Sequence, residues 1–215
     1  DYVVIADMAK HLPADTSRAG QALYAANQMI NVLRSGDPNT WQQARALAAG
    51  FFAAHAGDGQ HNLSAIGHAH IDTAWLWPMA ETRRKCARSF SSALRLMDDY
   101  PEYKFACPQA QQLAWMKEFY PDLYACIKVR VAEGRFIPVG GTWVEPDCNI
   151  PSGESIVRQF LYGQRFFQQE FDITCNEFWN PDVFGYSAAL PQILHGAGIP
   201  FFLPQKLSWN QFTQP

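Results

Sequence analysis

The sequence predicts an α/β fold in which part of a parallel sheet or barrel follows a helical segment. Two observations support this prediction. Residues 1 to about 60 carry apolar side chains at helical spacing. From Asn62 onward, short apolar runs alternate with longer amphipathic stretches, which is typical of parallel strands covered by helices. We therefore expect a helical lead-in over 1–60 and an α/β domain over 61–215.

The lead-in shows two marked helical patterns. Apolar residues recur at helical spacing over 22–33, and the Ser-Gly-Asp-Pro stretch at 35–38 ends that helix. A second helix is expected over Asn39–His55, ended by the Ala-Gly-Asp-Gly turn at 56–59. No pattern here indicates chemistry, which favours a connecting role between domains.

Five strands and five helices are expected in the α/β domain. The predicted strands are Leu63–Gly67, which should begin as a buried apolar run, Tyr103–Ala106, Phe136–Val139, Glu177–Trp179 and Pro200–Leu203. The predicted helices are Met79–Asp98, Gln109–Phe119, Pro121–Glu133, Gly153–Phe171 and Leu190–Ala197. In folds of this type ligands bind at the carboxyl ends of the strands, so the residues after each strand are the first candidates for a site.

The composition is that of a globular protein. With 48% hydrophobic residues, 17% charged residues and a net charge of -3, neither disorder nor a nucleic-acid surface is indicated. No run of about eighteen apolar residues predicts a membrane span. The 5 cysteines form no C-x-x-C pair, which favours reduced thiols in a cytosolic protein over a disulfide framework or a thiolate zinc site. We expect a cytoplasmic protein, with a vacuolar or lysosomal location as the alternative. The chain begins without Met, so we expect it to be an internal piece.

The first strand end carries the most marked group of polar and aromatic residues. His70 and Asp72 are two residues apart, so in extended chain both side chains can face one ion. Imidazole with carboxylate suits zinc or a similar divalent metal, although a structural histidine–aspartate pair is an equal alternative. His68 is expected in a supporting role. Trp75 is expected to form an aromatic wall against a sugar ring, and Trp77 to lie in the core.

Two further strand ends carry acids. Asp182 lies between Pro181 and a Phe-Gly turn, and such rigid placement suits a nucleophile or a metal ligand better than a helix cap. Glu145 and Asp147 follow the glycine pair 140–141, whose backbone can adopt angles closed to other residues. They are expected either to hydrogen-bond sugar hydroxyls or to close a structural loop. The expected substrate contacts are Trp75, Trp143, Glu145, Asp147 and Tyr186.

Three blocks carry a resemblance to a known family. The stretches at 70–75, 136–147 and 178–187 resemble the α-mannosidases of glycoside hydrolase family 38, most closely the cytosolic and vacuolar type. The resemblance covers residues 62–215. It implies the first part of a distorted β/α barrel of seven parallel strands with a metal site at its mouth.

The resemblance also implies roles. His70, Asp72 and Asp182 would be metal ligands for Zn²⁺ or Co²⁺, and Asp182 would also be the catalytic nucleophile. The reaction would be hydrolysis of α-mannosides or free oligosaccharides with retention of configuration. A metal with open positions can chelate the cis O2 and O3 of mannose. The family's fourth ligand and its acid/base aspartate lie downstream of Pro215, so we expect residues 1–215 alone to be inactive and to bind metal weakly.

The expected partners are an α-mannoside oligosaccharide, the remainder of the catalytic chain and, for the full-length enzyme, further copies of itself. Neither nucleic acid nor a membrane is expected. Two other functions fit the same residues. A metal-dependent polysaccharide deacetylase or amidase would use aspartate and histidine ligands to activate water. A non-catalytic sugar-binding module would keep the cleft without the chemistry.

Overall fold

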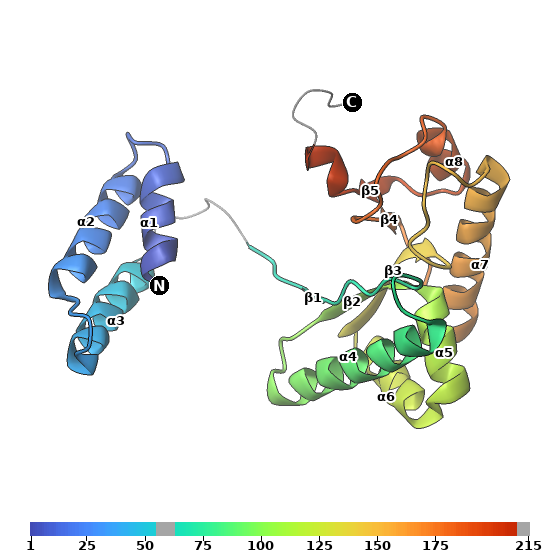
Figure 1. Cartoon of the computed structure of the whole chain (residues 1–215), viewed down its shortest axis with the longest axis horizontal. Helices are drawn as coiled ribbons and strands as arrows, with labels where there is room; N and C mark the ends of the chain where they lie inside the picture. The colour runs from blue at the N-terminus through green and yellow to red at the C-terminus, as the bar shows by residue number, and fades with distance from the viewer. Residues whose placement is uncertain (55–62, 210–215) are drawn as a thin grey trace. The chain divides into compact units, whose positions relative to one another are not determined.

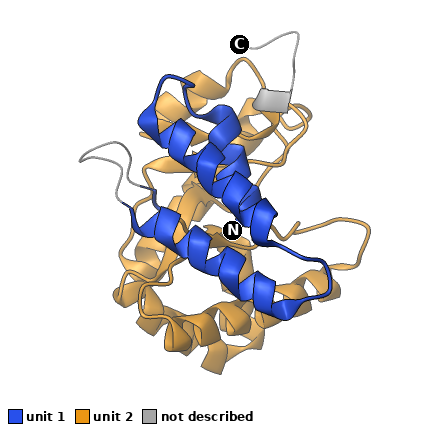
Figure 2. Ribbon diagram, turned by 90° about the vertical axis from the view of Figure 1, so that its left-hand side faces the viewer, with its two compact units in different colours: residues 1–64 blue, residues 65–215 orange. Residues whose placement is uncertain are grey.

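A computed structural model describes residues 1–54 and 63–209 of the chain (Figure 1). It contains two compact units, Asp1–Ser64 and Ala65–Pro215 (Figure 2). The expected helix end at His55 and the turn at 56–59 lie outside the described residues. None of the described helices is both long and apolar enough to cross a membrane.

The first unit is built from three helices, α1 (Tyr2–His11), α2 (Ser17–Val32) and α3 (Pro38–Ala53). The hydroxyl oxygen of Thr16 accepts from the backbone N–H of Ala19, and this cap starts α2. The side chain of Asp37 caps α3, with Pro38 at its first position. The core is made mainly of small side chains, which let the helices approach closely: Ile5, Ala22, Ala25, Ala26, Met29, Ala44, Ala48 and Phe51.

The second unit confirms the α/β fold with parallel strands. Strands β1 (Gly67–His68), β2 (Phe105–Gln109) and β3 (Phe136–Thr142) form one parallel sheet, and β4 (Glu177–Trp179) pairs in parallel with β5 (Phe201–Leu203). The helices are α4 (Met79–Asp99), α5 (Ala110–Phe119), α6 (Pro121–Ala132), α7 (Gly153–Phe171) and α8 (Leu190–Gly196), followed by the short 3-10 helix η1 (Lys206–Trp209). Closure of these strands into a barrel stays a prediction.

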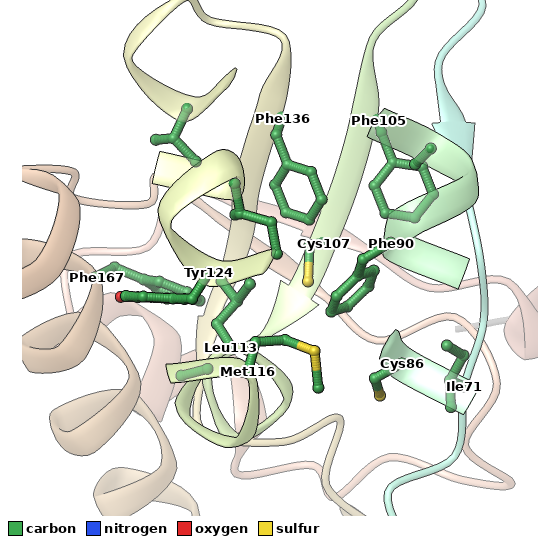
Figure 3. Close-up of a cluster of buried hydrophobic side chains, with 14 of the residues drawn as sticks. Ile71, Cys86, Phe90, Phe105, Cys107, Leu113, Met116, Tyr124, Phe136 and Phe167 are labelled. Carbon is green, nitrogen blue, oxygen red and sulfur yellow. The ribbon is translucent and has the colours of Figure 1, made fainter. Parts of the chain in front are cut away.

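The main core lies between the three-stranded sheet and the helices α4 to α7 (Figure 3). Phe90, Phe105 and Phe136 meet there with ring centroids 5.3 to 6.0 Å apart, within the range of favourable aromatic pairs. Leu113 and Met116 of α5 are fully buried beside them. Each buried side chain of this size contributes about 1.5–3 kcal/mol, so this cluster holds the helices to the sheet.

Helix α7 packs directly against β3 because it has a glycine at the point of contact. A Cβ at Gly163 would lie 2.3 Å from the carbonyl carbon of Thr142, closer than any side chain can fit. At the end of β3, Gly140 and Gly141 have φ of 84° and 69°, as the sequence predicted for this glycine pair. The chain can therefore turn sharply at the carboxyl end of β3.

The predicted buried strand at Leu63–Gly67 is wrong in its first part. The strand covers only Gly67 and His68, and Leu63 is 95% exposed. The backbone N–H of Gly67 donates to the Lys104 carbonyl, which is where pairing with β2 begins. Residues 63–66 come before this contact, so their apolar side chains have no strand to pack with in the described part of the chain.

Candidate active site

The loops after β1 and β3 line a pocket of about 320 Å³ at the carboxyl ends of the strands. The lining residues are His70, Asp72, Thr73, Ala74, Gln109, Val144, Glu145, Pro146, Asp147, Pro151 and Gln159. Four of the residues that the sequence singled out are in this group. The topology brings them together because neighbouring parallel strands end at the same edge.

His70 is at the centre of the acidic groups. Its Nε2 lies 3.4 Å from Oδ1 of Asp72 and 3.3 Å from Oδ2 of Asp182, which reaches it from the loop after β4. Its Nδ1 lies 3.3 Å from Oε2 of Glu145. The three residues expected as metal ligands are therefore neighbours, although Asp182 comes more than a hundred residues after His70 and Asp72 in the chain.

Three carboxylates make this site strongly negative. The Glu145 carboxylate beside Nδ1 is the main reason that the pKa of His70 rises to about 9; burial opposes the rise, and Asp72 and Asp182 add to it. The surroundings of the ring thus favour a positive charge at the centre of the site. The same excess of negative charge would favour a divalent cation.

The donor atoms suit a metal such as zinc. Two ligand atoms on a tetrahedral zinc ion lie about 3.4 Å apart, which matches the separation of Nε2 from each aspartate oxygen. A second grouping exists on the other side of the ring. His68, His70 and Glu145 offer ligand atoms that all lie within 4.8 Å of one another. The described residues therefore offer one group whose ligand atoms all lie close together, and a second in which Asp72 and Asp182 each approach Nε2 of His70.

Asp182 has a second charged neighbour. Its Oδ1 lies 2.5 Å from Nζ of Lys206, while its Oδ2 faces His70. Lys206 was not among the residues that the sequence singled out. Its position just beyond β5 was the available signal, because the end of β5 lies beside the end of β4.

The aromatic residues occupy different environments. Trp75 is 54% exposed in the loop after β1, so its ring is available to a ligand. Trp143 packs edge-on against Phe166, and its Nε1 donates to Oε1 of Gln111 over 3.0 Å. The structure does not place Trp143 in the lining of the pocket.

Tyr186 and Asp147 behave differently from each other. The hydroxyl of Tyr186 donates to the Asn180 carbonyl over 2.8 Å, and its ring packs on Phe202, so it supports the loop that carries Asp182. Asp147 lines the pocket and is exposed, although its Oδ1 also accepts from the backbone N–H of Asn149. Tyr186 therefore supports the site, and Asp147 is the exposed residue of the two that can meet a sugar hydroxyl.

Buried polar side chains hold the loop that carries Asp72, and the sequence analysis gave them no such role. Nε2 of Gln109 and Nε2 of Gln112 both donate to the Ile71 carbonyl, over 3.0 and 2.8 Å. The hydroxyl of Thr82 donates to the Thr73 carbonyl over 3.0 Å. Gln109 and Gln112 had a signal, since they stand beside apolar runs and a buried polar residue must be hydrogen-bonded. Thr82 had none, because it stands between Glu81 and Arg83.

Known proteins are similar to this chain in sequence. Residues 60–214 match the family model described as the glycosyl hydrolases family 38 N-terminal domain. Alpha-mannosidase 2C1 of Homo sapiens is 59% identical over 98% of this chain, and the Alpha-mannosidase of Saccharomyces cerevisiae is 44% identical over 99%. The chain spans 20% and 21% of the length of these two relatives.

A solved structure shows the same fold. An alpha-mannosidase from Enterococcus faecalis V583 superposes with a TM-score of 0.59 and 25% identity, over 65% of this chain and 16% of that one. The family match, the relatives and the fold agree with the three sequence blocks that first suggested the resemblance. This chain belongs to glycosyl hydrolase family 38 and carries its N-terminal domain.

Proposed function

We propose that the full-length protein is a retaining, metal-dependent α-mannosidase that releases mannose from α-mannosides and free oligosaccharides. The observation that carries the proposal is the meeting of His70, Asp72 and Asp182 beside a pocket. Relatives that carry the name alpha-mannosidase support it. We propose further that residues 1–60 form a lead-in and that 61–215 begin the catalytic barrel.

The nucleophile in this proposal is Asp182. One of its oxygens faces Nε2 of His70 and the other faces Nζ of Lys206, so contacts on both sides hold the carboxylate. These contacts orient it, as attack on the anomeric carbon requires. The product of that attack is a covalent glycosyl–enzyme on Asp182, which water then hydrolyses with retention of configuration.

The metal would be held by His70, Asp72 and Asp182 with a further ligand from outside this chain. When bound, Zn²⁺ or Co²⁺ supplies a Lewis acid that can chelate the cis O2 and O3 hydroxyls of mannose. Trp75 offers an exposed ring beneath the sugar, and Asp147 offers an exposed carboxylate to its hydroxyls. A second carboxyl group, also from outside this chain, would serve as acid and then as base.

A cytoplasmic location is part of the proposal. All five cysteines lie in the described part of the chain and are free thiols, four of them buried. Reduced thiols are typical of the cytosol. Fractionation of cells that express the full-length protein would test the location, and recovery in sealed vacuoles would contradict it.

The activity test uses the full-length protein and an aryl α-mannoside. We expect activity to be lost on chelation and restored by Zn²⁺ or Co²⁺, with the α-anomer of mannose as the first product. Asp182→Ala should lower kcat by at least about 10⁴-fold, as removal of a nucleophile does. Glu170→Gln, far along α7 from the pocket, is the control and should keep full activity. Failure of every metal to restore activity would contradict the proposal.

The two alternative functions predict other products. A deacetylase would release acetate from an acetylated polysaccharide and would not need a carboxylate nucleophile. A binding module would retain mannosides without turnover. Trapping of a glycosyl adduct on Asp182 would exclude both.

A further inference from the structure

We propose that Glu145 is a positioning residue that orients His70. In this role its carboxylate accepts a hydrogen bond from Nδ1–H of His70, so that Nε2 presents its lone pair to the metal position beside Asp72 and Asp182. The inference rests on the proposed function for the presence of the metal. It departs from the expectation that Glu145 contacts sugar.

The position of Glu145 supports this role. Its side chain is 5% exposed, whereas those of His70, Asp72 and Asp182 are 30%, 36% and 40% exposed. Neither carboxylate oxygen has a hydrogen-bond partner among the described residues. Nδ1 of His70 lies 3.3 Å from its Oε2. Glu145 is thus a buried acid whose available partner is the imidazole of His70.

His68 is the other histidine that could donate a hydrogen bond to Glu145, and its tautomer excludes this. Nδ1 of His68 lies 3.1 Å from the Ala106 carbonyl, and a carbonyl can only accept, so this nitrogen carries the hydrogen. In neutral His68 the other nitrogen, Nε2, then has a lone pair and cannot donate to Glu145. His68 Nε2 is itself buried without a partner in the described structure.

The partner of Glu145 therefore decides the tautomer of His70. When a metal lies between Nε2 and the two aspartate oxygens, Glu145 is the carboxylate that still needs a donor. A buried carboxylate without one costs about 1–3 kcal/mol or more, so the Nδ1–H form of His70 is the form that suits both partners. That form has its lone pair on Nε2, the nitrogen between the two aspartate oxygens. Metal-binding histidines commonly have such a carboxylate on the second nitrogen, which fixes the ring and increases its basicity.

Two other roles for Glu145 make different predictions. As a sugar contact it would need an accessible carboxylate, and Asp147, two residues later, is the exposed acid. As a metal ligand it would share an ion with His68 and His70. That ion would lie on the Nδ1 side of the His70 ring, and not on the Nε2 side where the two aspartates lie.

The test measures metal affinity in the full-length protein by competition with a chelator. Glu145→Gln, of nearly the same shape, should bind one Zn²⁺ or Co²⁺ about 10–100-fold more weakly than the wild type. The visible spectrum of the Co²⁺ form should shift, because the basicity of the His70 ligand changes. Asp72→Asn, which removes a ligand itself, should lose more affinity than Glu145→Gln. Glu145→Asp keeps the charge and should recover part of the affinity.

Glu170→Gln is the matched control. It also removes a largely buried glutamate that makes ionic contacts, to Lys117 and Lys128, and neither lysine lines the pocket. Its metal affinity and Co²⁺ spectrum should equal those of the wild type. A weaker metal affinity in this variant would show that any lost acid has the effect, and would overturn the inference.

The remaining outcomes separate the inference from the proposed function. Unchanged metal affinity with a raised KM in Glu145→Gln would make Glu145 a sugar contact and overturn the inference alone. Loss of metal binding in Glu145→Gln with little effect of Asp72→Asn would make Glu145 a ligand, and would also overturn it. A wild-type protein that neither binds metal nor hydrolyses mannosides would overturn the proposed function first.

Discussion

The core of the α/β unit and the carboxyl ends of its strands differ in the kind of atoms that they bury. In the core, Phe90, Phe105 and Phe136 pack ring against ring, and almost every buried atom is apolar. At the strand ends, Glu145, Asn180 and His68 each bury a polar atom without a hydrogen-bond partner in the described structure. Apolar packing explains the first region. It does not explain the second, because burying a polar atom without a partner is unfavourable.

The difference indicates where the chain serves function at the expense of stability. Unpartnered buried polar atoms are costly, and native structures keep them mainly at sites that bind or react. Two buried glutamates show the contrast. Glu170 is satisfied by Lys117, Lys128 and Tyr124, whereas neither oxygen of Glu145 has a hydrogen-bond partner among the described residues.

Removal of a core aromatic ring should give the largest change in stability. Phe136→Ala should lower the free energy of unfolding of residues 1–215 by about 3–5 kcal/mol, because it leaves a cavity among Phe90 and Phe105. Urea unfolding followed by tryptophan fluorescence would measure it. Val129→Ala, at a site 56% exposed, should change it by less than about 0.5 kcal/mol. Equal losses in the two variants would mean that this cluster is not the stabilising core.

The contact between α7 and β3 should give the next largest effect. Gly163→Ala forces a methyl group to within 2.3 Å of the Thr142 backbone and should destabilise the chain by about 1–3 kcal/mol. Gly50→Ala in α3 meets no atom within 4 Å and should instead stabilise the chain by about 0.5–1 kcal/mol. Thermal unfolding of both variants would show opposite signs. A neutral Gly163→Ala would mean that α7 can move away from β3 at no cost.

The satisfied glutamate should give the smallest effect, and one that depends on pH. Burial alone would raise the pKa of Glu170, but Lys117, Tyr124 and Lys128 hold it below its ordinary value. A lowered pKa adds stability that is present above the ordinary pKa and is lost as pH falls through the folded-state pKa. Glu170→Gln should therefore cost about 1 kcal/mol at neutral pH.

Urea titrations of wild type and Glu170→Gln at neutral pH and at about pH 3, below the ordinary glutamate pKa, would measure this difference. The gap between the two proteins should narrow at the lower pH. A gap that widened on acidification would mean that burial, and not the lysines, controls this carboxyl group.

Regular elements were largely predictable from the sequence. The helix Gly153–Phe171 and the strand Glu177–Trp179 have the predicted bounds, and Met79–Asp99 is one residue longer than predicted. Their apolar side chains recur at regular spacing, and burial of these side chains in the core stabilises the elements directly. Leu63–Ile66 has the same apolar pattern without a partner strand, and its prediction was wrong.

Contacts within loops could not be predicted in the same way. The alternation of side chains along a strand suggested that His70 and Asp72 face one side, and the structure brings them within 3.4 Å. Gly140 and Gly141 themselves have positive φ, and beyond them periodicity no longer says where a side chain points. Trp143 consequently packs against Phe166, away from the pocket lining, and Glu145 turns towards His70.

The division of the strands into two sheets has a mechanical consequence. β3 and β4 lie side by side (Figure 1), yet they belong to separate sheets, and the N–H of Gly140 donates to the Glu177 side chain. His70 and Asp72 follow a strand of one sheet, and Asp182 follows a strand of the other. A metal held by all three would cross-link the sheets across this seam. At a free metal concentration of a hundred times the dissociation constant, binding would then add about 2.7 kcal/mol to the stability of the fold. The ion that binds the sugar would therefore also stabilise the domain.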